Sequence, residues 1–167
     1  ENEIPEGVSS IINGDYRVGE FLSMDTRVPL ISATGSTRMG RTLGAAVAGR
    51  MGRSILELGG NNAIIVTPSS DLNIVLTGAL FGAVGTAGQR CTSTRRLIVH
   101  ESIYETVRQS LAKAYTQLRI GNPLDQNNHV GPLIDQAAVR NYLASLEKIE
   151  AQGGTMLVQV GVLEGSG

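Results

Sequence analysis

The sequence predicts an α/β fold of layered, mostly parallel sheets with flanking helices, and three observations favour it. Short runs rich in β-branched residues alternate with longer runs of helical periodicity, an order that is typical of parallel sheets. Glycine is frequent, with 21 residues, whereas aromatic residues make up only 4% of the chain. Both features fit a protein in which many tight turns join strands to helices.

The first half of the chain contains two kinds of predicted element. Short apolar runs predict strands at 8–12, 28–33, 54–58 and 63–66. Helical patterns predict helices at 19–24, 37–49 and 71–84. We expect Ser69 or Ser70 to cap the last of these helices, because a serine side chain accepts hydrogen bonds from the first helical amides.

The second half continues the alternation. A glycine-rich loop at 85–89 leads to Cys91, and a strand is predicted at 95–100. Ser102 and Glu105 form a capping-box pattern that predicts the start of the next helix. Residues 121–134 form a long predicted loop, which favours a functional or partner-facing role. A helix at 136–152 and a strand at 155–160 are predicted to follow.

Bulk properties argue against several classes of function. The net charge is −1, with 14 basic and 15 acidic residues, which predicts no general attraction to nucleic acid or to an anionic membrane. No apolar run is long enough to cross a bilayer. One cysteine forms no internal disulfide, which fits a reducing compartment and makes a cytoplasmic location our expectation. That cysteine and two distant histidines, His100 and His129, give no metal-binding cluster.

Two residues carry the candidate chemistry. Glu57 lies in the run Leu56–Gly60, at the end of a predicted strand, and Cys91 follows the glycine-rich loop. A thiolate is a nucleophile, and a carboxylate beside an acyl-enzyme can deprotonate the attacking water. The alternatives are a small buried cysteine and a glutamate bound at a strand edge.

A third feature is the turn at Thr34–Ser36, between a predicted strand and a predicted helix. Such a turn presents backbone amides to a phosphate group, although it also serves as an ordinary helix cap. The stretch Gly35–Gly44 does not contain the spacing of a dinucleotide-binding glycine motif.

These stretches together resemble the aldehyde dehydrogenase superfamily. The resemblance covers nearly the whole chain and rests on five motifs in the family's order: Thr34–Thr37, Leu56–Asn62, Gly88–Thr92, Gly121–Pro123 and Gly131–Leu133. The sequence of residues Gly85–Cys91 is most similar to that of the α-aminoadipic semialdehyde dehydrogenase (antiquitin) branch of the superfamily.

The resemblance implies a domain organisation. Residues 1–58 correspond to the C-terminal part of a dinucleotide-binding domain, and residues 59–167 correspond to the N-terminal part of a catalytic domain. We therefore expect the chain to be an internal fragment that is inactive by itself, because the family's oxyanion-binding asparagine and ribose-binding residues lie outside it. The resemblance also implies a homo-oligomer, a dimer or a tetramer, in the whole protein.

The resemblance further implies a mechanism and roles for residues. Cys91 attacks an aldehyde to form a thiohemiacetal, NAD or NADP accepts a hydride, and water activated by Glu57 hydrolyses the thioester. The backbone N–H of Cys91 is a candidate oxyanion donor. Arg90 anchors the charged end of an amino-acid semialdehyde, which the branch places in lysine catabolism. Asn61 and Asn62 are expected to make a turn. The implied cofactor-binding residues are Gly35, Ser36, Met39, Gly40, Leu58 and Gly59.

Two other classes of function compete with this interpretation. A cysteine–histidine hydrolase would pair Cys91 with His100 or His129 and would need no nicotinamide cofactor. A non-catalytic binding or scaffold domain would keep the fold without turnover. The presence of both Cys91 and Glu57 argues against a scaffold in the whole protein.

Overall fold

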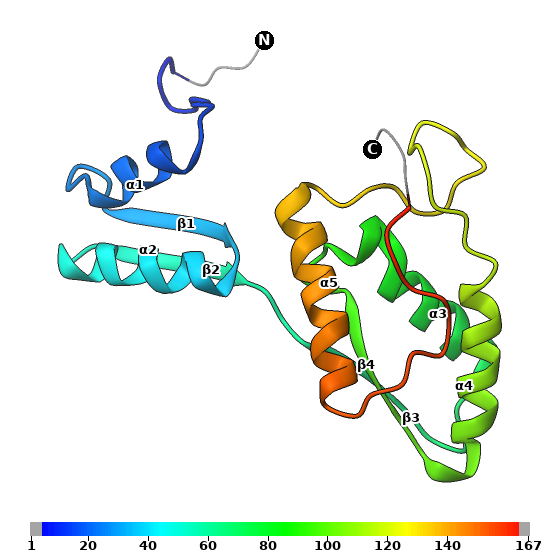
Figure 1. Cartoon of the computed structure of the whole chain (residues 1–167). Helices are drawn as coiled ribbons and strands as arrows, with labels where there is room; N and C mark the ends of the chain where they lie inside the picture. The colour runs from blue at the N-terminus through cyan, green and yellow to red at the C-terminus, as the bar shows by residue number, and fades with distance from the viewer. Residues whose placement is uncertain (1–4, 164–167) are drawn as a thin grey trace. The chain divides into compact units, whose positions relative to one another are not determined.

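A computed structural model describes residues 5–163 of the chain. The chain divides into two compact units, with the boundary between Gly59 and Gly60. Each unit contains one pair of parallel strands joined through a helix (Figure 1). The predicted α/β fold class with parallel strands is confirmed.

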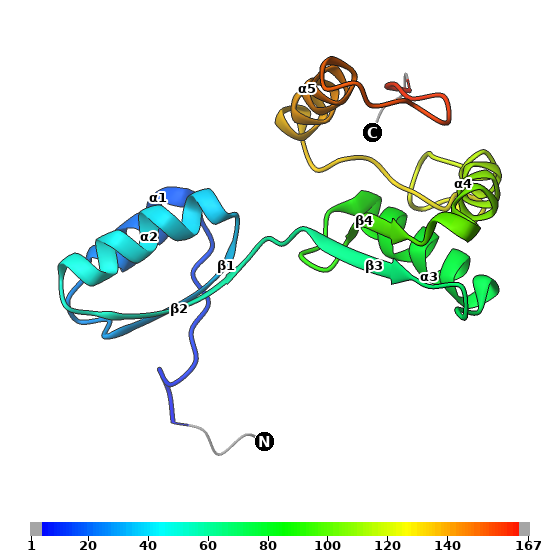
Figure 2. The ribbon, with the colours of Figure 1, turned by 90° about the horizontal axis from the view of Figure 1, so that it is seen from below.

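Unit 1 consists of two helices and a two-stranded sheet. Its elements are α1 (Tyr16–Met24), β1 (Leu30–Gly35), α2 (Thr37–Gly49) and β2 (Arg53–Leu58). The strands β1 and β2 run parallel, with Thr34 opposite Glu57 and Gly35 opposite Leu58. Both helices lie on one face of this sheet (Figure 2).

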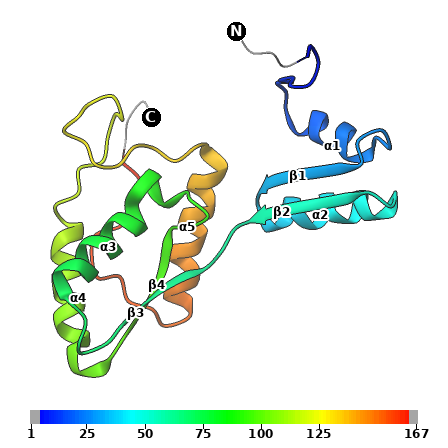
Figure 3. The ribbon, with the colours of Figure 1, turned by 180° about the vertical axis from the view of Figure 1, so that it is seen from behind.

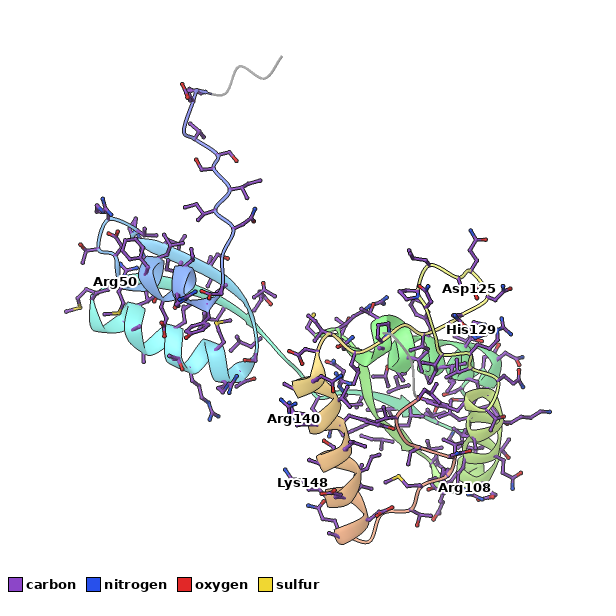
Figure 4. All side chains as sticks on the ribbon, turned by 45° about the horizontal axis from the view of Figure 1, so that its top comes forward. Arg50, Arg108, Asp125, His129, Arg140 and Lys148 are labelled. Carbon is purple, nitrogen blue, oxygen red and sulfur yellow. The ribbon has the colours of Figure 1, made fainter. Side chains whose placement is uncertain are left out.

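The core of unit 1 lies between its helices and its sheet. Val47 of α2 is fully buried, and the side chain of Arg50 links the two helices, because its Nε donates a 2.6 Å hydrogen bond to the carbonyl of Ser23 (Figure 4). The other face of the sheet has no covering layer among the described residues. There Leu30 and Ile55 are 47% and 51% exposed.

Unit 2 contains the remaining elements. Strands β3 (Asn62–Val66) and β4 (Thr94–Val99) pair in parallel. Helices α3 (Leu72–Val84) and α4 (Glu101–Tyr115) contact each other and β4 (Figure 3). The short 3₁₀ turn η1 (Gly85–Gly88) follows α3, and α5 (Gln136–Ala151) comes last.

The core of unit 2 is formed where α3 and α4 pack on the sheet. Val66, Ala79 and Val107 are its buried apolar residues. As in unit 1, one face of the sheet stays open: Ile65 and Ile98, which are paired across the strands, are 70% and 52% exposed. Helix α5 has no fully buried residue.

Two predicted strands are wrong. Residues 8–12 and 155–160 form no strand, although both runs are apolar. A strand is stable only when its backbone hydrogen bonds to a neighbour, and an apolar pattern does not supply that neighbour. Without one, Ile11 remains largely exposed.

Two predicted helix caps are also wrong. Asp71, and not Ser69 or Ser70, caps α3, because its carboxylate accepts from the amides of Asn73 and Ile74. Helix α4 is capped by His100 in place of Ser102, and Glu105 pairs with Arg108 instead of closing a capping box. The other helices and strands lie within a few residues of the predicted ranges.

Within residues 5–163, no helix is long and apolar enough to cross a membrane.

Candidate active site

Cys91 lies on the connection that returns from α3 to β4, and the residue is exposed. After Gly85, three successive residues of the connection have positive φ: Thr86 at 55°, Ala87 at 52° and Gly88 at 69°. Residues other than glycine rarely adopt this left-handed conformation, which costs about 1–3 kcal/mol where it occurs. Such local strain is typical of functional loops, and here it ends at Gly88, three residues before the candidate nucleophile.

The turn that contains Cys91 is closed by the residues on either side of it. The amide of Arg90 donates to the Oγ of Ser93 at 3.1 Å, and the amide of Ser93 donates to the carbonyl of Arg90 at 3.2 Å. Ser93 is only 1% exposed, so its hydroxyl is a fixed internal partner and not a surface group. These two bonds give the backbone around Cys91 a defined conformation.

The side chain of Asn62 reaches the same turn from the start of β3. Its Nδ2 donates to the carbonyl of Cys91 at 2.7 Å and to the carbonyl of Ser93 at 3.1 Å. The prediction that Asn62 makes a turn is therefore wrong, since the residue begins a strand and braces the Cys91 loop. No local pattern distinguishes this use of asparagine, because the partners lie 29 and 31 positions away.

Arg90 folds back onto the end of α3. Its Nε donates to the Oγ1 of Thr86 at 2.8 Å, and its guanidinium lies 5.5 Å from the centre of the Phe81 ring, a cation–π distance. Arg90 has no carboxylate partner within residues 5–163, and its two Nη groups have no hydrogen-bond acceptor there.

The long loop after α4 is tied to the Cys91 loop through Gln89. The side-chain oxygen of Gln89 accepts a 2.9 Å hydrogen bond from the amide of Ile134. Inside the long loop, which carries the labelled Asp125 and His129 in Figure 4, the amide of Arg119 donates to Nδ1 of His129 at 3.0 Å. The loop therefore has internal order and a contact with the segment that precedes Cys91.

Glu57 is the next-to-last residue of β2 in unit 1. Its side chain is exposed and projects from the open face of the sheet, on the same side as Ile55. Its carboxylate forms no hydrogen bond or ion pair with any described residue, so the strand-edge amides do not bind it.

The turn between β1 and α2 combines Gly35, Ser36 and Met39. The Oγ of Ser36 caps α2 by accepting from the amide of Met39 at 3.1 Å. The amides of Thr37 and Arg38 have no acceptor within the described residues, and the first turn of α2 contains no acidic side chain. This helix end therefore has the donors and the positive dipole that suit an anionic group.

Gly40 and Leu58 contact each other beneath that turn. A Cβ atom added at Gly40 would lie 2.6 Å from both terminal carbons of Leu58, so the absence of a side chain lets α2 approach β2 closely. The structure thus gives Gly40 a packing role. Gly59 follows Leu58 as the last residue of unit 1, and a Cβ atom added there would meet no atom of the described residues within 4 Å, its chain neighbours aside.

Each of the two histidines, His100 and His129, accepts a hydrogen bond from a backbone amide. Nδ1 of His100 accepts from the amide of Ser102, and Nδ1 of His129 accepts from the amide of Arg119. Neither histidine hydrogen bonds to Cys91, so the contacts of a cysteine–histidine hydrolase are missing from the described part of the chain. Residues 5–163 also contain no group of side chains that would hold a metal ion.

Comparisons with solved structures place this geometry among known folds. One similar structure is betaine aldehyde dehydrogenase from Staphylococcus aureus in complex with NAD⁺, with a TM-score of 0.84 and 29% sequence identity. The match covers 87% of this chain and 29% of the betaine aldehyde dehydrogenase chain. An NADP-dependent enzyme from E. coli matches 81% of this chain and 28% of its own, with a TM-score of 0.77 and 36% identity.

Sequence comparisons give the family. α-Aminoadipic semialdehyde dehydrogenase from Bos taurus is 48% identical over 157 residues, which are 94% of this chain and 29% of the bovine protein. The chain spans about a third of the length of the curated relatives that it matches. The model of the aldehyde dehydrogenase family matches residues 1–166. The chain, by this match over nearly its whole length, belongs to the aldehyde dehydrogenase family.

Proposed function

We propose that the protein oxidises an aldehyde to a carboxylic acid with NAD or NADP, and that Cys91 is the nucleophile. The observation that carries the proposal is the exposed thiol of Cys91 on a strained loop whose backbone is held by Asn62 and Ser93. A held nucleophile favours attack, because less freedom is lost on reaching the transition state.

The proposed chemistry has two stages. The Cys91 thiolate forms an S–C bond to the aldehyde carbon, and the electron pair of the carbonyl moves to its oxygen, which gives a thiohemiacetal. Loss of hydride from that carbon leaves a thioester on Cys91. Glu57 then removes a proton from water, which attacks the thioester and releases the acid and the thiol. The Glu57 carboxylate has no partner among residues 5–163, which supports this role.

The cofactor site is proposed at the carboxyl ends of β1 and β2. The amides of Thr37 and Arg38 would hold the pyrophosphate, with Gly35, Ser36, Met39 and Gly40 around it and Leu58 and Gly59 at the nicotinamide side. The chemistry that NAD supplies when bound is acceptance of the hydride. The amides without acceptors and the lack of an acidic residue in the first turn of α2 fit such an anionic group.

This assignment corresponds to a domain organisation. We propose that residues 1–58 belong to a dinucleotide-binding domain and that residues 59–167 belong to a catalytic domain. The boundary between the two compact units, at Gly59 and Gly60, supports this division. We also propose a homo-oligomer for the whole protein.

The proposed substrate is an amino-acid semialdehyde such as α-aminoadipic semialdehyde. The bovine relative is named for that compound, and Arg90 has two Nη groups without an acceptor among the described residues. A guanidinium binds a carboxylate through two parallel hydrogen bonds, which fixes its orientation as well as its distance.

The test uses the protein at its full encoded length, with α-aminoadipic semialdehyde and NAD. We expect NADH to form in wild type, and we expect Cys91→Ala to abolish it while the circular dichroism spectrum and the melting temperature stay unchanged. The control is Ser145→Ala, a change of similar size on α5 that lies far along the sequence from Cys91. Normal turnover by Cys91→Ala would exclude Cys91 as the nucleophile.

A further inference from the structure

The two peptide groups beside the Cα of Cys91 are both held by their carbonyl oxygens. The carbonyl of Arg90 accepts from the amide of Ser93 at 3.2 Å, and the carbonyl of Cys91 accepts from Nδ2 of Asn62 at 2.7 Å. In a trans peptide the N–H points away from the C=O of the same peptide plane. Fixing the two carbonyls therefore also fixes the directions of the Cys91 and Thr92 N–H groups.

Those two N–H groups are unused in the described structure. Neither the amide of Cys91 nor that of Thr92 has a hydrogen-bond acceptor within residues 5–163, although both neighbours, Arg90 and Ser93, donate theirs. Two adjacent amides with fixed directions and no acceptor are suited to a developing negative charge.

We propose that Asn62 is a positioning residue for the reaction, because its carboxamide orients the Cys91 peptide so that backbone amides beside the thiol receive the oxyanion. This inference rests on the aldehyde oxidation proposed above. When the Sγ–C bond forms, the carbonyl electron pair moves to the aldehyde oxygen, and the oxyanion takes its hydrogen bonds from amides that are already aimed. Asn62 touches neither substrate nor cofactor in this proposal, and it acts only through the loop backbone.

The chain offers a matched control in Asn61. It is the neighbouring residue, it carries the same side chain, and it is exposed like Asn62. Its carbonyl accepts from Arg96, but its side chain makes no hydrogen bond with the described residues. Asn61→Ala therefore removes the same chemical group without removing the brace.

The experiment compares Asn62→Ala, Asn62→Asp and Asn61→Ala with wild type in the protein at its full encoded length. The first readout is amide hydrogen exchange, measured by mass spectrometry on peptides that cover residues 89–95. We expect exchange to be at least about tenfold faster in both Asn62 variants, since the local opening of a segment sets its exchange rate. Peptides from α4 should exchange as in wild type, which shows that the fold is retained.

The second readout is the rate of the first NADH burst with α-aminoadipic semialdehyde. We expect it to fall by about 10- to 100-fold in both Asn62 variants, in the range seen when a reacting group is misplaced or an oxyanion donor is lost. The KM for NAD should stay within about threefold, and Asn61→Ala should match wild type. Asn62→Ser, which is too short to span both carbonyls, replaces Asn62→Ala where that variant does not fold.

The outcomes separate this inference from the proposed function. A normal wild-type burst that is unchanged in the Asn62 variants overturns the role of Asn62 alone. A fall in the burst rate of Asn61→Ala as large as that in the Asn62 variants also overturns the role of Asn62. Absence of NADH formation in wild type instead contradicts the proposed function, and the exchange comparison then decides by itself whether Asn62 braces the loop.

Discussion

The two units of the molecule use the same motif but differ in where they place the candidate residues. Each is a strand, a helix and a parallel strand, with one helix-covered face and one open face. In unit 1 the return from α2 to β2 is short, at 50–52, and the candidates lie at the carboxyl ends of the strands. In unit 2 the return from α3 to β4 spans 85–93, and it carries Arg90 and Cys91 to the amino ends of the strands.

This difference shows how one motif supports two kinds of chemistry. The carboxyl end of β1 leads directly into a helix, so it presents backbone amides that suit a bound anion. The long return in unit 2 does not lead directly from a strand into a helix. It has room for left-handed residues and for a nucleophile whose backbone is held by Asn62. Cys91→Ala, described with the proposed function, and changes at Glu57 and Arg90 test whether the two ends have these separate roles. Changes at two glycines and at two carboxylates then test the packing and the acid stability of the two units.

The largest expected effect after loss of Cys91 itself comes from Glu57 in unit 1. Glu57→Gln removes the proposed base but not the nucleophile, so hydride transfer should continue while thioester hydrolysis stalls. We expect a burst of NADH followed by steady turnover reduced by about 10²–10⁴-fold. Stopped-flow absorbance measures both phases.

Glu20→Gln is the matched control, since Glu20 is an exposed carboxylate on α1 of the same unit. It should behave as wild type. Equal loss of burst and turnover in Glu57→Gln would show that Glu57 does more than activate water, and it would weaken the separation of roles between the units.

In unit 2, Arg90 tests whether the loop that carries Cys91 also binds the substrate carboxylate. Arg90→Ala should lower kcat/KM for α-aminoadipic semialdehyde by about one to two decades, or roughly 1.5–3 kcal/mol, because a charge-assisted contact is lost. Hexanal, which carries no carboxylate, should be oxidised at nearly the wild-type rate. Steady-state kinetics with both aldehydes make the measurement.

Equal loss on both aldehydes would assign Arg90 to loop structure, where its bond to Thr86 and its contact with Phe81 already place it. No loss on either aldehyde would leave it without a role in substrate binding.

Two glycines test the packing of the helices rather than the chemistry. Gly40→Ala should destabilise unit 1 by about 1–3 kcal/mol, since the new Cβ would meet the terminal carbons of Leu58 at 2.6 Å. Gly78→Ala in α3 brings the new Cβ within 4 Å of no described atom outside its own helix backbone, and it should stabilise its helix by about 0.5–1 kcal/mol. Urea unfolding of both variants measures the difference, and shifts of the same sign would contradict the close approach of α2 to β2.

The smallest expected effect is a change in acid stability, and it should appear in both units. The side chain of Arg27 lowers the pKa of Asp25 to about 2, and Arg108, with help from Gln109, lowers the pKa of Glu105 to about 2. Both values lie below the usual range near 4. The stability that these carboxylates contribute is therefore present above about pH 4 and is lost as the pH falls towards 2.

Asp25→Asn and Glu105→Gln should each make the melting temperature less dependent on pH between about 5 and 2. The change should be slight, because each pair has a partner that is open to solvent, Arg27 at 82% and Glu105 at 57% exposure, and ion pairs in contact with water contribute little. Calorimetry at several pH values measures it. If the melting temperature of a variant depends on pH as steeply as that of wild type, the ion pair in that unit does not persist in solution.

Local patterns predicted most of the fold. The range predicted for α2, residues 37–49, is the one observed, because its periodicity and its Ser36 cap are properties of neighbouring residues. The same local rules failed for 8–12 and 155–160, where strand formation depends on a distant partner. They also misassigned the caps of α3 and α4, because several side chains near each helix start are able to cap it and backbone geometry selects among them.

The candidate residues show the same division. The sequence by itself determined the parallel α/β architecture, the family and the presence of one cysteine and one strand-end glutamate, because these depend on residue order and on local periodicity. Only the tertiary structure decided that Asn62 braces the Cys91 loop, that Gly40 admits Leu58 and that Arg90 rests on Phe81. Such contacts join residues that are separated along the chain, and which donor meets which acceptor is settled only when the backbone has folded.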